Sequence, residues 1–180
     1  MTARRSLILS GSLGKGHDVV GEACASALGA VGVESRMVDS VGLMGQGSGA
    51  LGDRVFRALL SRPPVYDAFH FTQLRGDGPL GQLAERAALA RLSPNLRREV
   101  DGFGADLIIS VFATGAGAAA RLKRDERPGL GTVVVMTDSF AHRMWVHEGT
   151  DLFLVTSRLA AASARRCSRR RLCPATASTQ

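Results

Sequence analysis

Residues 6–17 have the sequence SLILSGSLGKGH, in which a short apolar run leads into a loop that contains three glycines. Apolar residues then recur with helical spacing from Val19 to Val31, and Gly32 ends that pattern. A second apolar run at 33–39 predicts another strand. The order strand, helix, strand predicts a βαβ unit with a right-handed crossover, and therefore a parallel sheet.

The rest of the chain continues this alternation. Buried parallel strands are predicted by the apolar runs at 106–112, 132–136 and 151–156. Helices are predicted by apolar periodicity at 51–60, 80–92, 116–123 and 158–166. The predicted fold class is α/β, with a doubly wound, mostly parallel Rossmann-like sheet.

Two shorter segments interrupt the pattern. Ser93 and Pro94 supply an N-cap and a proline at the first helical position, so a separate short helix is predicted from there to about Gly102. Residues 40–50 are rich in glycine and are expected to form a mobile loop.

Length and composition predict one folded domain, because 180 residues with 45% apolar composition can bury one α/β core. Five of the seven net positive charges come from arginines at 165, 166, 169, 170 and 171, which leaves +2 for residues 1–164. A body so close to neutral does not indicate a nucleic-acid partner. The three cysteines show no disulfide framework or metal-ligand spacing, which favours the cytosol, and no run of about 18 apolar residues predicts a membrane-spanning helix.

Ligands of doubly wound sheets bind at the carboxyl ends of the strands, which here are followed by the loops at 11–17, 39–50, 112–115 and 137–149. His17 ends the first of these loops at a helix N-terminus, where the helix dipole helps to keep an imidazole neutral and basic. It is therefore a candidate general base, although capping the helix or bonding to a carbonyl is an equal alternative.

Stock nucleotide motifs fit the first loop poorly. A P-loop needs a glycine where Leu9 stands, and the dinucleotide fingerprint needs a third glycine where Val19 stands. Asp39, at the end of the second strand, keeps a dinucleotide site open as an alternative, because a ribose-binding carboxylate occupies such a position.

The segment 135–148, VMTDSFAHRMWVHE, places several functional side chains after one buried strand: Asp138, His142, Trp145 and His147. Two histidines five residues apart, without thiolates or a His-Glu-x-x-His pattern, give only a weak zinc signal, so no metal or other cofactor is expected. Trp145 is the only tryptophan, and both a core position and a pocket wall remain open for it.

These segments resemble the N-terminal domain of the monogalactosyldiacylglycerol synthase and processive diacylglycerol glucosyltransferase family. The resemblance is carried by residues 8–17, ILSGSLGKGH, by 135–138, VMTD, with 142–147, HRMWVH, and by 106–112, DLIISVF, within a span of about 6–164. It implies the N-terminal half of a GT-B glycosyltransferase, which holds the lipid acceptor, while a C-terminal domain holds the nucleotide sugar. Transfer is expected to invert the anomeric carbon without a bound metal.

The resemblance also implies roles for individual residues. His17 corresponds to the base on the acceptor hydroxyl, and Asp138 is the second expected catalytic residue. The expected acceptor or lipid contacts are Gly14, Gly16, His142, Trp145, His147, Phe56 and Tyr66.

The aromatic-rich region that contains Phe56 and Tyr66 corresponds to the membrane-facing part of the family. An apolar helical stripe at 51–60 is flanked there by Arg54, Arg57 and Arg62, which suit anionic headgroups. A core-packing helix is the alternative. The implied location is cytoplasmic and peripheral, on the inner face of the cell membrane.

The chain departs from the family pattern at its end. A donor domain is absent from the 180 residues, and residues 167–180 do not continue the pattern. We therefore expect an acceptor-side domain at 1–166, followed by an unstructured tail that a frameshift or truncation would explain. The expected function is sugar transfer from a nucleotide sugar to diacylglycerol or a glycosyl-diacylglycerol, with no activity of the chain alone. The alternatives are a stand-alone nucleotide- or lipid-binding module and the acceptor half of a peptidoglycan-type glycosyltransferase.

Overall fold

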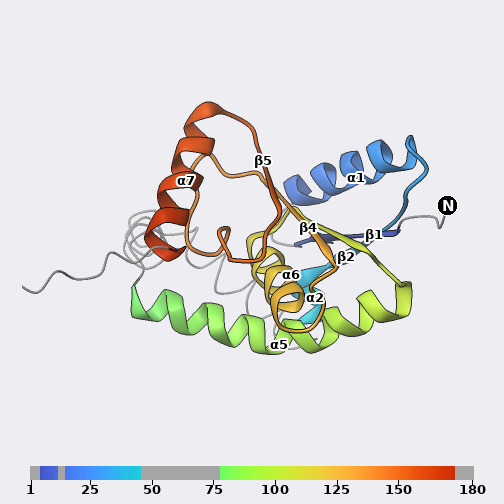
Figure 1. Ribbon diagram of the computed structural model, residues 1–180, viewed down its shortest axis with the longest axis horizontal. Coiled ribbons are helices and arrows are strands. Elements are labelled where there is room, and N and C mark those ends of the chain that lie inside the picture. The colour runs from blue at the N-terminus through green and yellow to red at the C-terminus, as the bar shows by residue number, and fades with distance from the viewer. Residues whose placement is uncertain (1–4, 12–14, 46–77, 173–180) are drawn as a thin grey trace, which may run out of the picture.

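A computed structural model describes residues 5–11, 15–45 and 78–172. Its centre is a five-stranded parallel sheet with the strand order β2-β1-β3-β4-β5 (Figure 1). The strands are β1 (Arg5–Ser10), β2 (Glu34–Asp39), β3 (Leu107–Ser110), β4 (Gly131–Met136) and β5 (Leu152–Val155). The predicted strands are confirmed. β3 ends earlier than expected because the chain turns after Val111 into the next helix.

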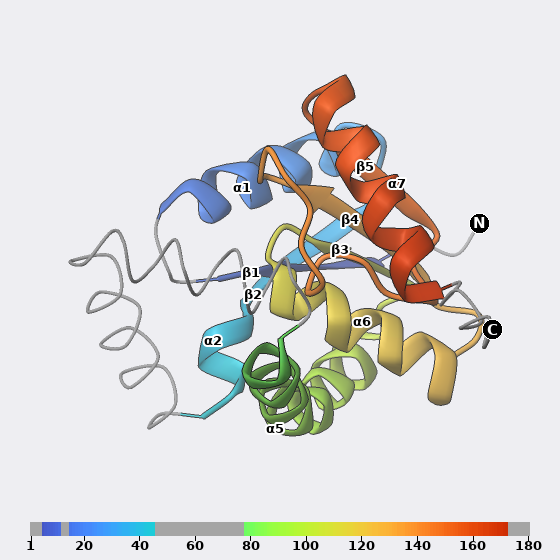
Figure 2. The same ribbon diagram turned by 90° about the vertical axis from the view of Figure 1, so that its left-hand side faces the viewer.

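Helices cover both faces of the sheet, as the doubly wound prediction required. Ile8 and Ile109 pack against α1 (Lys15–Gly29) on one face. Leu7 and Leu9, which point the other way along β1, pack against α5 (Pro79–Phe103) and α6 (Ala113–Asp125). Figure 1 and Figure 2 both show α1 and α5 on opposite sides of the sheet.

The separate helix predicted from Ser93 is wrong, because α5 runs without interruption from Pro79 to Phe103 and contains Pro94. The buried residues on either side of the proline belong to one apolar stripe, which includes Leu92, Leu96 and Val100. Packing of this stripe against the sheet offsets the backbone hydrogen bond that proline removes. At this position, burial of the apolar stripe outweighs the low helix propensity of proline.

Two other boundaries differ from expectation. The expected loop at 40–50 begins with a short helix, α2 (Ser40–Leu43), because the Asp39 carboxylate accepts hydrogen bonds from the backbone N–H groups of Val41 and Gly42. The last helix, α7 (Arg158–Leu172), continues past 166, and Cys167 packs partly buried against the core, so residues 167–172 are not an unstructured tail.

Several predictions fall outside the described residues. They include the loop position Gly14, the helix at 51–60 with Phe56, and Tyr66. Among the helices that the structure describes, none combines the length and the apolar composition that crossing a membrane requires.

Candidate active site

His17 lies at the carboxyl edge of the sheet, where it follows β1 and contacts the chain just after β3. It lies in the first turn of α1, and its Nδ1 atom is 2.7 Å from the backbone oxygen of Val111, which follows β3. Its ring also meets the edge of Phe112, with the ring centroids 5.2 Å apart. Because a carbonyl oxygen only accepts hydrogen bonds, Nδ1 carries the proton in the neutral imidazole and Nε2 keeps its lone pair. The Val111 contact thus selects the tautomer that a base needs.

Local contacts hold the start of α1 in place. The Ser10 hydroxyl donates a 2.6 Å hydrogen bond to the Asp18 carboxylate, which ties the end of β1 to the first turn. At Gly11 a Cβ atom would lie 2.5 Å from the Phe112 ring, so only glycine lets that ring approach. A Cβ at Gly16 would meet nothing within 4 Å, so packing gives no reason for glycine there.

One carboxylate oxygen of Asp138 contacts the ring nitrogens of two side chains. Trp145 donates a 2.7 Å hydrogen bond from Nε1 to Asp138 Oδ2, and His142 Nε2 lies 3.3 Å from the same atom. The Asp138 side chain is 43% exposed, whereas the His142 side chain is only 8% exposed. The two rings therefore fix the position of the carboxylate through Oδ2, while the side chain stays accessible to a ligand.

The electrostatics of this group favour a charged carboxylate. Burial by itself raises the pKa of Asp138, but hydrogen bonds from His142 and Trp145 outweigh it and hold this pKa below the ordinary value. Electrostatic interactions with His142 and, more weakly, with His17 lower this pKa further. His17 follows β1 and Asp138 follows β4, so both predicted catalytic residues lie at the carboxyl edge of the sheet.

The lowered pKa of Asp138 predicts a specific dependence of stability on pH. A carboxyl whose pKa is lower in the folded than in the unfolded chain stabilises the fold above its unfolded pKa, about 4, and this stabilisation is lost as the pH falls through the folded pKa. We expect Asp138→Asn to lower the free energy of unfolding at pH 7, and the difference from the unmodified chain to shrink towards pH 3. Urea unfolding at several pH values, followed by Trp145 fluorescence, measures this; an equal difference at pH 7 and pH 3 would contradict it.

Trp145 occupies the core position rather than the pocket wall, the two alternatives that its sequence context left open. It is 1% exposed and packs with Val134 and Met136 of β4 and with Ala160 and Ala164 of α7. Only its N–H group reaches the candidate site. Its expected lipid contact stays a prediction, and its visible effect is on Asp138.

His147 has different partners from the other three residues of its segment. Its Nε2 atom is 2.8 Å from the backbone oxygen of Met144, and its Nδ1 atom is 3.7 Å from Glu85 of α5. Arg143 reaches the same carboxylate, with Nε 2.6 Å from Glu85 Oε2. Together with the Ser163 hydroxyl, which accepts from the Ala141 N–H, these contacts fasten the segment after β4 to α5 and α7.

Glu85 and Arg143 were not predicted from the sequence, although both are buried and charged. A signal existed for Glu85, because it lies on the same helix face as Leu92, Leu96 and Val100 of the buried stripe. An acid on such a face needs a partner. Arg143 gave no comparable signal. Within the described ranges, no group of three or more His, Cys, Asp and Glu side chains is arranged to hold a metal ion.

The comparison with protein families gives one match, to the family described as Monogalactosyldiacylglycerol (MGDG) synthase, over residues 59–168. This range is more than half of the chain and includes Asp138, His142, Trp145 and His147, but it begins after His17. No curated protein and no solved structure matches the chain.

Proposed function

Because the chain belongs to the monogalactosyldiacylglycerol synthase family, we propose that it forms the acceptor side of a glycosyltransferase that makes a glycolipid. Its acceptor would be diacylglycerol or a glycosyl-diacylglycerol, and the sugar would come from a nucleotide sugar. The observation that carries this proposal is the family match, which spans the segment containing Asp138. The fold supports it, since His17 and Asp138 lie at the carboxyl edge of the sheet, where such folds bind ligands.

In this proposal, His17 is the general base. The acceptor hydroxyl attacks the anomeric carbon of the sugar, its proton passes to His17 Nε2, and the bond from that carbon to the nucleotide phosphate breaks. The Val111 carbonyl orients the ring through Nδ1 and also stabilises the imidazolium that forms. A positioned base of this kind contributes about 10²–10⁴-fold to a rate.

Asp138 serves this step electrostatically. Its carboxylate is ionised at neutral pH and acts on His17 as an attractive charge, which favours the protonated imidazole as the proton arrives. Trp145 and His142 are positioning residues in this scheme, because they hold Asp138 rather than the substrate.

The remaining parts of the reaction lie outside the described site. We propose that the nucleotide sugar is held by a second domain that is not among these 180 residues, so the chain alone does not transfer sugar. Because a lipid acceptor lies in a membrane, the protein must reach the membrane surface to bind it. We propose that it binds peripherally to the anionic cytoplasmic face.

Vesicle experiments test the two halves of the proposal separately. The full chain is mixed with phosphatidylcholine vesicles with and without diacylglycerol, floated on a density gradient, and incubated with labelled nucleotide sugars. We expect flotation that depends on diacylglycerol, no labelled lipid from the chain alone, and unchanged flotation for His17→Ala. Equal flotation with and without diacylglycerol would contradict an acceptor site. Formation of labelled lipid by the chain alone would contradict the need for a second domain.

A further inference from the structure

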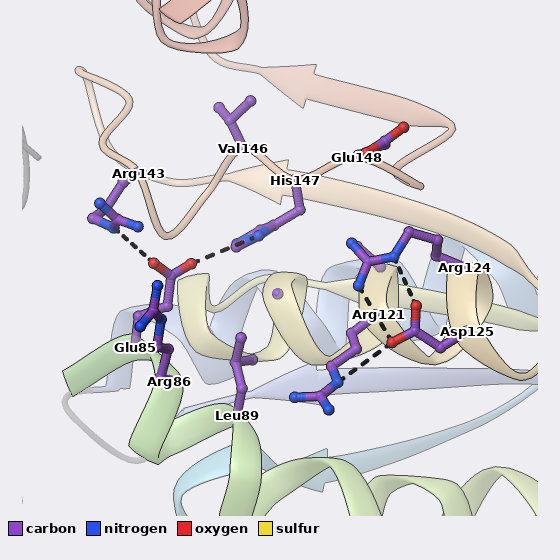
Figure 3. Close-up of a pocket in the computed structure, with 12 residues that line it drawn as sticks. Glu85, Arg86, Leu89, Arg121, Arg124, Asp125, Arg143, Val146, His147 and Glu148 are labelled. Atoms are coloured by element: carbon purple, nitrogen blue, oxygen red, sulfur yellow. Dashed lines mark hydrogen bonds and ion pairs between the residues drawn. The ribbon is translucent and has the colours of Figure 1, made fainter. Parts of the chain in front are cut away.

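A cavity of about 430 Å³ lies between α5, α6 and the segment after β4 (Figure 3), and its lining includes His147 but none of His17, Asp138, His142 and Trp145. Four arginines line it, namely Arg86 of α5, Arg121 and Arg124 of α6, and Arg143. In Figure 3, Arg86 lies at one end, Arg121 and Arg124 lie towards the other end, and His147 lies between them. The cavity is thus cationic on two of its walls.

The carboxylates of the cavity do not neutralise all these arginines. Arg143 is paired with Glu85 at 2.6 Å. At the other end, Asp125 is shared, because Arg124 Nε lies 2.7 Å and Arg121 Nε 3.5 Å from its two oxygens. Two guanidinium groups therefore compete for one carboxylate.

Arg86 adds to this surplus. Within the described residues its side chain makes no hydrogen bond or ion pair, so its guanidinium is available to a ligand. The third acid of the lining, Glu148, attracts Arg124 but leaves the cavity with four arginines against three carboxylates. The lining therefore carries a net positive charge that a bound anion would balance.

Gly117 of α6 lets the His147 ring pack closely against that helix at one side of the cavity. A Cβ atom on Gly117 would lie 2.9 Å from His147 Nε2 and 3.1 Å from Leu89, so a larger residue there would crowd the space between α5 and α6. The volume lies within the range of cavities that bind small organic ligands, so a phosphate group with an attached alcohol can enter.

We propose that this cavity binds a phosphate group, with Arg86 and Arg121 as its principal ligands. The planar fork of a guanidinium matches two phosphate oxygens at once, and two forks from different helices clamp the group between α5 and α6. The phosphate comes either from a soluble phosphomonoester or from an anionic lipid headgroup. The inference does not rest on sugar transfer, because binding alone reveals it.

Calorimetric titration of the full chain with inorganic phosphate and with glycerol 3-phosphate tests the site. We expect binding that weakens at least about tenfold in Arg86→Gln/Arg121→Gln, a loss of roughly 1.4 kcal/mol. Both replaced side chains are exposed, so the fold should persist, which circular dichroism checks. Arg97→Gln/Arg127→Gln is the matched control, since it removes the same charge from arginines paired with Glu126 and Asp101 elsewhere.

Flotation with vesicles that contain phosphatidic acid, compared with pure phosphatidylcholine, distinguishes the two sources. Arg86- and Arg121-dependent binding of both soluble phosphate and these vesicles supports the site with a lipid source. Such binding of soluble phosphate alone supports it with a soluble source. An absence of phosphate binding, or an equal loss in the control variant, overturns the proposal.

Discussion

Replacement of His17 by alanine is expected to lower the rate of sugar transfer by about 10²–10⁴-fold in a complete enzyme that joins this chain to a donor-binding domain of the same family. The expected loss is in kcat, because the proton leaves the acceptor hydroxyl only as the new bond forms. Steady-state kinetics with diacylglycerol in mixed micelles measures it. Lys15→Ala, in the same exposed turn, is the control and should change the rate little.

His17→Gln separates a base from a structural contact. A glutamine amide can still donate a hydrogen bond to the Val111 carbonyl, but it cannot accept a proton from the acceptor. The glutamine variant should therefore be as slow as the alanine variant, while both keep diacylglycerol-dependent flotation. A glutamine variant with the original rate would remove His17 from the chemistry and leave it the structural role of bonding a carbonyl.

Much of the fold was predictable because the decisive signals are local. Parallel strands are buried on both faces, so β1, β3 and β4 appear in the sequence as short apolar runs between glycine-bearing turns. α5 was divided wrongly because Pro94 is a strong local signal for a helix start, whereas the burial of Leu96 and Val100 depends on contacts far along the chain. Such contacts have no local signature.

The candidate site shows the same division. The cluster of Asp138, His142 and Trp145 was predictable because the three residues lie close together in the sequence after one strand. The contact of His17 with Val111 spans 94 residues, and the pair of Arg143 with Glu85 spans 58. The position of His17 at the carboxyl edge follows from the rule for strand ends, but its partner Val111 is too distant in the sequence to be predicted.

Truncation of Trp145 should have the largest effect on stability. Its ring is 1% exposed and contacts the cluster that joins α6, β4 and α7, so Trp145→Ala removes a large buried surface and leaves a cavity between three elements. We expect a loss of about 3–5 kcal/mol in the free energy of unfolding. Because Trp145 is the only tryptophan, urea unfolding is followed by far-ultraviolet circular dichroism in all variants.

Two further variants separate packing from hydrogen bonding. Trp145→Phe keeps an aromatic ring but removes the N–H that Asp138 accepts, so it should cost less than alanine and let the pKa of Asp138 rise. Phe140→Ala, on the same segment, truncates a ring that is 39% exposed and should cost less than about 1 kcal/mol. The expected order of destabilisation is Trp145→Ala, Trp145→Phe, Phe140→Ala. If Trp145→Ala is no less stable than Phe140→Ala, the Trp145 ring does not anchor the segment that carries Asp138. That result would also contradict the proposal that Trp145 positions the Asp138 carboxylate.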